Sequence, residues 1–155
     1  MTDADRRYEI PRAKGCFGCG TNNDAGLGLA PVREDGVVRA TYRPREAHRG
    51  FSRTLHGGVV AALFDEVTCM AVATEVVAFV ATVELTVRYL RPVPMDGELR
   101  LEAHDAGPDP DDARRRRAEA KLLDSTGNIL ATARGLYQPI PADRLDKFFT
   151  QAAAT

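Results

Sequence analysis

The 155-residue sequence has no tryptophan, only three cysteines and almost no excess of either charge. Lysine and arginine total 21 against 22 aspartate and glutamate residues, so no overall positive field draws the protein to nucleic acid or to an anionic membrane. Aromatic residues make up only 6% of the chain, and we find no aromatic platform for stacking single-stranded bases. We therefore expect neither a nucleic-acid partner nor a membrane partner, and local cations must hold any anionic ligand.

Long apolar runs are also missing. The longest, at residues 59–64 and 76–83, fall far short of the roughly 18 residues needed to span a bilayer. Residues 1–7 are mostly polar and lack the apolar stretch of a secretory signal. Three cysteines cannot all pair within one chain. These observations predict a soluble cytoplasmic protein, and its length fits one domain.

The cysteines give weak signals for metal or redox chemistry. Cys16-x-x-Cys19 supplies half of a tetrahedral zinc site, but no second Cys or His pair follows at a usable spacing. A redox role would need a thioredoxin-like context, which is absent. The prediction is a packed turn at Cys16–Cys19, a core position for Cys69, and no metal or redox cofactor.

Turn residues divide the chain into an arm, a main domain and a tail. Residues 1–30 are rich in glycine and read as an irregular arm of the same domain, residues 31–140 as the main domain, and residues 141–155 as a tail with a short helix over 142–149. Within the main domain, a strand is expected at 37–42, followed by a polar loop that leads to His56.

A single long helix is predicted for residues 58–74, where apolar and small side chains recur at spacings of three and four. Its small residues favour close packing against a sheet. Short linkers with Pro, Asp and Gly separate the later strands and favour hairpins, which predicts a four-strand antiparallel meander. The strands of that meander are expected at 79–90, 98–104, 113–123 and 129–137.

The most informative motif is His56-Gly57-Gly58 with Asp65 downstream. Seven residues at 100° each bring Asp65 back to the helical face of Gly58, but at about 1.5 Å per residue the two lie roughly 10 Å apart along the axis. They are too far apart to serve one carbonyl group. Two antiparallel copies of the helix would place the start of one beside the carboxylate of the other, which predicts a dimer with two shared sites.

The residue types suit addition of water to an activated carbonyl. Glycines allow close approach to free N–H groups, and the positive end of a helix stabilises an oxyanion. We expect Leu63, Phe64 and Val67 to remove Asp65 partly from water and make it a better base. The alternative is that the glycines merely begin a helix and Asp65 faces solvent.

These residues resemble the hotdog-fold acyl-CoA thioesterases of the phenylacetate-pathway and human acyl-CoA thioesterase type, in the 4-hydroxybenzoyl-CoA thioesterase superfamily. In that family a His-Gly-Gly motif opens the long helix and an Asp lies nine residues after the His, as His56 and Asp65 do here. Residues 82–92, which end in Tyr-x-Arg-Pro, and the Cys-Phe-Gly-Cys-Gly segment at 16–20 are similar as well. The resemblance covers about residues 16–137.

The resemblance implies an α+β hotdog fold, in which a curved antiparallel β-sheet wraps around one long central α-helix. It implies that Gly57 and Gly58 polarise the thioester carbonyl and that Asp65 of a partner chain is the base or nucleophile. Thr82 would orient water or the intermediate. His56 would support the glycine turn and hydrogen-bond the substrate.

Other residues are candidates for binding the substrate. Some relatives have an Asn six residues before the motif's His, where this chain has Gly50, so either His48 or Arg49 replaces that contact or the contact is absent. We also place Glu66 among the substrate-binding residues.

Arginine forks match phosphate geometry, which makes Arg88, Arg91 and the run 114–117 candidates for the phosphates of coenzyme A. The alternative for the run is a solvated strand.

The sequence therefore predicts hydrolysis of an acyl-CoA thioester by a homodimer, or by a tetramer built from it, without a separate cofactor. A hotdog hydratase or dehydratase acting on enoyl thioesters is the alternative enzyme. A non-catalytic acyl-CoA-binding module is the alternative outside enzymes.

Overall fold

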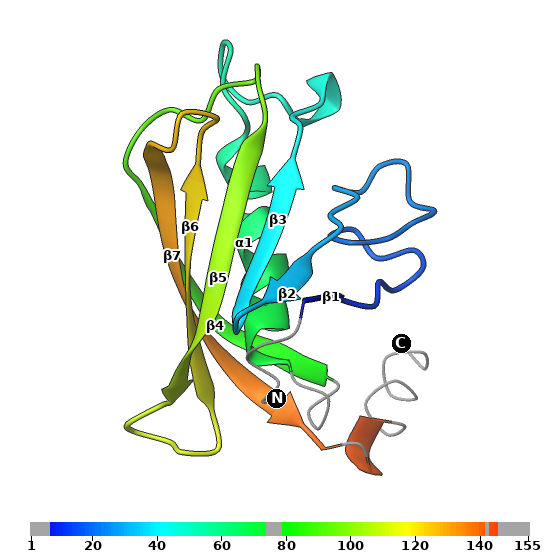
Figure 1. Ribbon diagram of the computed structural model, residues 1–155, viewed down its shortest axis with the longest axis vertical. Coiled ribbons are helices and arrows are strands. Elements are labelled where there is room, and N and C mark those ends of the chain that lie inside the picture. The colour runs from blue at the N-terminus through cyan, green and yellow to red at the C-terminus, as the bar shows by residue number, and fades with distance from the viewer. Residues whose placement is uncertain (1–6, 74–78, 142, 146–155) are drawn as a thin grey trace.

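The computed structural model describes residues 7–73, 79–141 and 143–145. One seven-stranded sheet, antiparallel throughout, bends around one long helix (Figure 1). None of the helices in the described ranges is long and apolar enough to cross a membrane. The predicted α+β class is confirmed. The elements are β1 (Tyr8–Glu9), β2 (Val32–Glu34), β3 (Val37–Tyr42), a 3₁₀ turn (Glu46–His48), α1 (Gly57–Val72), β4 (Phe79–Tyr89), β5 (Leu99–Pro108), β6 (Arg116–Leu123) and β7 (Ile129–Ile140).

The strand order is β1-β2-β3-β5-β6-β7-β4, which corrects the predicted four-strand meander. β5, β6 and β7 do form a meander, but β4 pairs with β7 and lies at the edge of the sheet. The link after β4 does not turn back into a hairpin, because hydrogen bonds hold it against the segment that precedes α1. Instead it runs past the start of α1, where the N–H of Leu55 donates to the carbonyl of Val93 at 2.8 Å.

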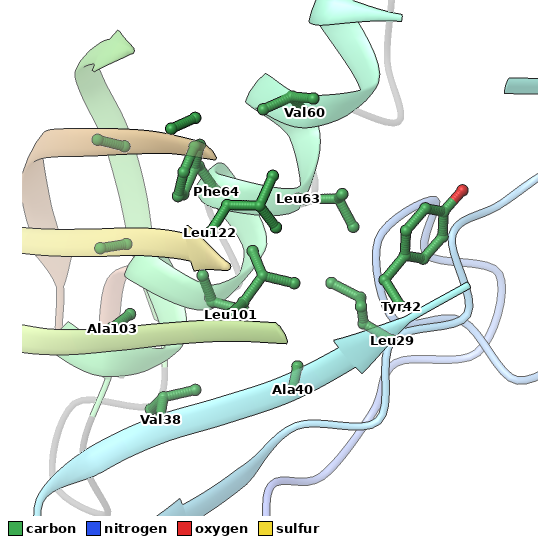
Figure 2. Packing of buried hydrophobic residues seen from close by; sticks show 14 of the residues in the cluster. Leu29, Val38, Ala40, Tyr42, Val60, Leu63, Phe64, Leu101, Ala103 and Leu122 are labelled. Carbon is green, nitrogen blue, oxygen red and sulfur yellow. The ribbon is translucent and has the colours of Figure 1, made fainter. Parts of the chain in front are cut away.

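The core lies between α1 and the concave face of the sheet. Figure 2 shows Leu63 and Phe64 of the helix facing Leu101 and Leu122 of the sheet. All four are fully buried, and each such side chain stabilises the fold by about 1.5–3 kcal/mol. Small residues on the central strands leave room for the helix. These are Ala103, Ala118, Ala131 and Ala133.

One buried polar pair crosses the core. The hydroxyl of Thr68 donates to the carbonyl of Phe64 at 2.6 Å and shares a hydrogen bond with the hydroxyl of Tyr137. A Cβ at Gly135 would lie 2.2 Å from the Tyr137 hydroxyl, so only glycine leaves space for this ring. Both hydroxyls are therefore satisfied inside the core, and burial raises the pKa of Tyr137.

The carboxyl end of α1 is capped by an arginine from β2. The Arg33 guanidinium is buried and donates to the carbonyls of Met70 and Ala73, the latter at 2.7 Å. These carbonyls lack partners within the helix and form the negative end of its dipole. The cap fixes where α1 ends, two residues before the predicted boundary.

Several other boundaries differ from the sequence prediction. β5 and β7 run on to Pro108 and Ile140, because bulges in the β5–β6 and β4–β7 ladders let the pairing continue past the predicted ends. β6 begins only at Arg116. The polar loop before His56 contains a 3₁₀ turn, and the predicted irregular arm contributes β1. Of the predicted C-terminal helix, residues 143–145 are helical, and 142 and 146–149 lie outside the described residues.

Candidate active site

The helix start is held by His56, the residue just before it. Nδ1 of His56 accepts a hydrogen bond from the N–H of Gly58 at 2.9 Å, and its carbonyl accepts from Val59 and Val60. The N–H of Gly57, the first helical residue, has no acceptor within the described part of the chain. Both glycines were expected to donate to a substrate carbonyl. In this geometry Gly58 is occupied by His56, and Gly57 offers the free donor.

A tyrosine that the sequence did not single out holds the same turn. The hydroxyl of Tyr89, near the end of β4, donates to the carbonyl of Gly57 at 2.7 Å. A Cβ at Gly57 would lie 3.5 Å from this hydroxyl, an ordinary contact. At Gly50, by contrast, a Cβ would lie 2.8 Å from the Cα of His56, so glycine lets the preceding loop press against the motif. Tyr89 is the tyrosine of the Tyr-x-Arg-Pro segment, and this motif was the sequence signal that could have identified it as a site residue.

The second half of the candidate site lies in the middle of α1. The hydroxyl of Thr82 donates to Oδ1 of the half-buried Asp65 at 2.8 Å and lies 3.5 Å from Sγ of Cys69. Burial raises the pKa of the Cys69 thiol to about 12, so the thiol stays protonated at neutral pH. The fold thus brings Thr82, which was expected to orient water or the intermediate, to Asp65 of the same chain. Cys69, expected only as core, borders the pair.

The environment of Asp65 differs from the one expected. Leu63, Phe64 and Val67 are fully buried in the core and do not enclose the carboxylate. At about 100° per residue, Leu63 and Val67 lie on the far side of the helix from Asp65. The carboxylate of Asp65 instead faces strand β4, where Thr82 donates to it.

The two halves are separated along one uninterrupted helix. Gly57 and Asp65 are eight positions apart within α1, which corresponds to about 12 Å along the helix axis. Beside Gly57 lies an open cleft of about 430 Å³, lined among others by Tyr89, Leu90 and Arg91. Arg91, an expected substrate-binding residue, is therefore near the helix start.

His48 and Arg49 precede the motif but face different ways. His48 is only 7% exposed and hydrogen-bonds the hydroxyl of Tyr42, so its side chain is not available to a substrate in this structure. This corrects its expected role. Its carbonyl accepts from the N–H of His56 at 3.0 Å and helps to fix the motif. Arg49 is exposed and forms a two-pronged pair with Glu46, at 2.5 and 2.6 Å.

Arg88 and Glu66 do not join the helix start. Arg88 lines a groove of about 560 Å³ on the outer face of the sheet, with Thr86, His104 and Arg134. Glu66 contacts the N-terminal arm, with Oε2 at 3.9 Å from Sγ of Cys16. The structure therefore does not bring these two expected substrate-binding residues to Gly57.

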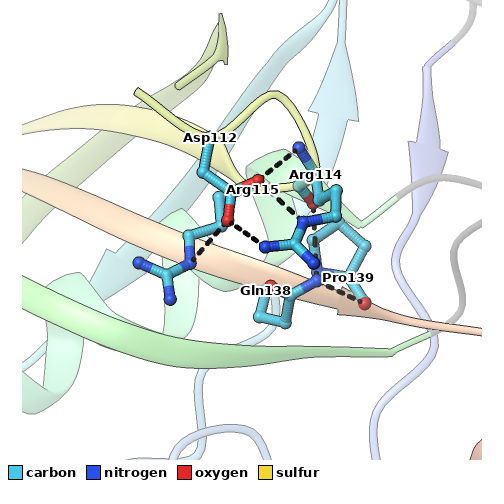
Figure 3. Close-up of polar contacts among 5 residues, drawn as sticks. All are labelled: Asp112, Arg114, Arg115, Gln138 and Pro139. Carbon is cyan, nitrogen blue, oxygen red and sulfur yellow. Dashed lines mark hydrogen bonds and ion pairs between the residues drawn. The ribbon is translucent and has the colours of Figure 1, made fainter. Parts of the chain in front are cut away.

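The run of four arginines at 114–117 is largely occupied by acidic partners. Arg114 and Arg115 pair with Asp112 in the link between β5 and β6, as Figure 3 shows. The side-chain hydrogen bond from Arg114 lowers the pKa of Asp112 to about 2. Arg116 pairs with Asp105 at 2.6 Å. The solvated-strand alternative therefore holds only for Arg116 and Arg117, because Arg114 and Arg115 lie in the link before β6.

Comparison with known proteins relates this chain to a protein family. The family model of the thioesterase superfamily matches residues 53–104, from the loop before His56 into β5. A search of the curated proteins finds no match.

Three solved structures illustrate the likeness. One thioesterase superfamily protein is 26% identical with a TM-score of 0.67, over 76% of this chain and 60% of its own length. A second is 30% identical with a TM-score of 0.63, over 72% of this chain and 83% of its own. The Escherichia coli PaaI protein of the phenylacetic acid degradation operon is 18% identical with a TM-score of 0.65, over 74% and 80%. The chain thus spans less than two thirds of the first protein. The hotdog fold expected from the sequence is confirmed.

Proposed function

Because this chain belongs to the thioesterase superfamily, we propose that it hydrolyses an acyl-CoA thioester to the free acid and coenzyme A. The observation that carries the proposal is the hydrogen bond from Thr82 to Asp65. It holds one oxygen of a half-buried carboxylate and leaves the other for a water molecule. A carboxylate that merely faced solvent from the helix would be hydrated and would need no hydrogen bond from a neighbouring strand.

In the proposed reaction Asp65 acts as a general base. Its free oxygen takes a proton from water as the water oxygen bonds to the thioester carbon. The carbonyl oxygen gains negative charge, which the N–H of Gly57 and the positive end of α1 stabilise. The tetrahedral intermediate then breaks its carbon–sulfur bond, and the coenzyme A thiolate leaves and takes up a proton. This step needs no metal or redox cofactor.

The proposed site is shared between two chains. About 12 Å of helix separates Gly57 from Asp65, too far for one carbonyl group to meet both. We propose that Gly57 of one chain works with Asp65 of the partner subunit. The edge strand β4 supports this, because Val83 and Tyr89 are about half exposed and β7 alone pairs with it among the described strands. A homodimer, or a tetramer built from it, would complete two sites.

Arg91 is the proposed contact for the phosphates of coenzyme A. It lies on the cleft beside Gly57, whereas Arg88 lies on the outer face of the sheet. A guanidinium group there can bind a phosphate through two parallel hydrogen bonds. Arg49 and His56 are both exposed, and they are further proposed contacts for the substrate.

The proposal is tested by supplying a panel of acyl-CoA esters and measuring the thiol released. We expect release for at least one ester, and loss of release in Asp65→Asn with the assembly intact. Glu84→Gln is a matched control, because Glu84 is an exposed carboxylate on β4 that hydrogen-bonds Thr86. Hydration of an enoyl-CoA without thiol release would instead indicate a hydratase. Tight binding without any turnover would indicate a binding module.

A further inference from the structure

Two cysteines of the N-terminal arm meet a carboxylate of α1. The sulfur atoms of Cys16 and Cys19 and a carboxylate oxygen of Glu66 all lie within 4.8 Å of one another. Cys19 is only 3% exposed, while Cys16 and Glu66 are half-buried. In sequence the Glu lies 50 residues after Cys16, so only the fold assembles the group.

The turn that carries the cysteines is fixed before any ligand arrives. The N–H of Gly20 donates to the carbonyl of Cys16 at 2.9 Å, which closes the turn on itself. The carbonyls of Phe17 and Gly18 accept from Leu27 and Leu29, at 2.6 and 2.9 Å. The sulfur positions therefore do not depend on a flexible loop, and a ligand would meet a preorganised pair.

Gly18 lets the carboxylate reach the sulfurs. A Cβ at Gly18 would lie 2.0 Å from Oε2 of Glu66, so any other residue would push the carboxylate away. No Lys, Arg or His side chain in the described ranges forms an ion pair with Glu66. The partner of the carboxylate is instead the Cys16 thiol at 3.9 Å, and a metal ion that replaced the thiol protons would link all three groups.

We propose that Cys16, Cys19 and Glu66 bind a zinc ion that fastens the N-terminal arm to α1. Two thiolates and a carboxylate suit Zn²⁺, with water or a further group as fourth ligand. Zinc–sulfur bonds of about 2.3 Å in a tetrahedron place the sulfurs roughly 3.8 Å apart, within the spacing found here. Binding expels one proton from each thiol. The role is structural and is separate from the hydrolysis proposed above.

The test uses the full chain, kept reduced and stripped with a chelator, and then titrated with Zn²⁺ against a chromophoric competitor. We expect one zinc per chain and a higher melting temperature in its presence. Cys16→Ser and Cys19→Ser should each abolish tight binding, and Glu66→Gln should weaken it at least about tenfold. Cys69→Ser is the matched control and should bind as the unaltered chain does, because Cys69 lies beside Thr82 and away from the arm.

Cobalt gives a second readout. Co²⁺ bound at this site should show the near-ultraviolet absorption of thiolate ligation, and that band should disappear in Cys16→Ser. If the Cys variants fail to fold, Glu66→Gln decides, since Gln keeps the shape of the side chain and removes its charge. Substoichiometric zinc, equal affinity in Glu66→Gln, or cobalt without the thiolate band would each overturn the proposal.

Discussion

The hydroxyl of Thr82 lies 2.8 Å from Oδ1 of Asp65 and joins the edge strand β4 to the middle of α1. Near the other end of β4, Tyr89 makes the corresponding connection to Gly57 at the start of the helix. One strand therefore positions both halves of the candidate site. Because this strand is at the edge of the sheet, a partner that pairs with β4 would also meet both halves.

Thr82→Val should lower kcat for thioester hydrolysis by about tenfold to a hundredfold with little change in KM, because a hydrogen bond to a charged group is worth about 1.5–3 kcal/mol. Valine keeps the shape of the side chain and removes the donor. Thr82→Ser keeps the donor and should retain most activity. Steady-state thiol release with the best ester of the panel measures both variants. Full activity in Thr82→Val would show that Thr82 has no role in catalysis.

Gly57→Pro should lower kcat about a hundredfold to a thousandfold, because it deletes the N–H proposed to stabilise the oxyanion. Proline suits the first helical position, and the extended backbone of His56 (ψ 134°) accommodates a following proline. Circular dichroism should show an unchanged helix. Gly57→Ala, which keeps the N–H, is the control. Equal rates in the two variants would argue against a role for this donor.

The positions of the helix and strands in the sequence were largely predictable, but the pairing of the strands in the sheet was not. Periodicity located α1 and the strands from β3 to β7 within a few residues. The pairing of β4 with β7 was not predicted, because local turn chemistry does not say which strands that are distant in the sequence pair with each other. The boundary at 72 depended on Arg33, a residue far away in the sequence. The division into an arm, a domain and a tail stays a prediction, although Leu27 and Leu29 of the arm enter the core.

The candidate site was predictable where its parts follow one another along one element. The spacing of Gly58 and Asp65 followed from helix geometry alone. Contacts between elements were harder. The meeting of Cys16, Cys19 and Glu66 and the bond from Tyr89 to Gly57 require the arm and β4 to be placed against α1. The burial of His48 likewise depends on Tyr42 of the neighbouring strand.

Arg33→Ala should lower the free energy of unfolding by about 2 kcal/mol, since it leaves the last carbonyls of α1 buried without donors. Urea unfolding followed by circular dichroism measures the loss. Arg39→Ala is the control, because the Arg39 pair with Glu34 is partly exposed and is expected to contribute less than about 1 kcal/mol. Equal losses in the two variants would contradict the helix cap.

Asp112 should stay ionised to unusually low pH. Its folded pKa of about 2 lies below the ordinary 3.8. The pairing with Arg114 therefore stabilises the fold fully at pH values above 3.8, and this stabilisation is lost as the pH falls through about 2. Arg114→Ala should raise the pKa toward 3.8, as NMR of the carboxyl carbon would show. Arg117→Ala should leave it unchanged. An unaltered pKa in Arg114→Ala would show that the pair does not form in solution.

A mixed dimer tests the shared site most directly. Asp65→Asn and Gly57→Pro chains, co-expressed with different affinity tags, can be purified as the pair that holds one copy of each. Each variant alone should be nearly inactive. The mixed dimer has one intact site of two and should recover about half of the unaltered activity per dimer. Activity no higher than that of the separate variants would contradict catalysis by Gly57 of one chain and Asp65 of the other.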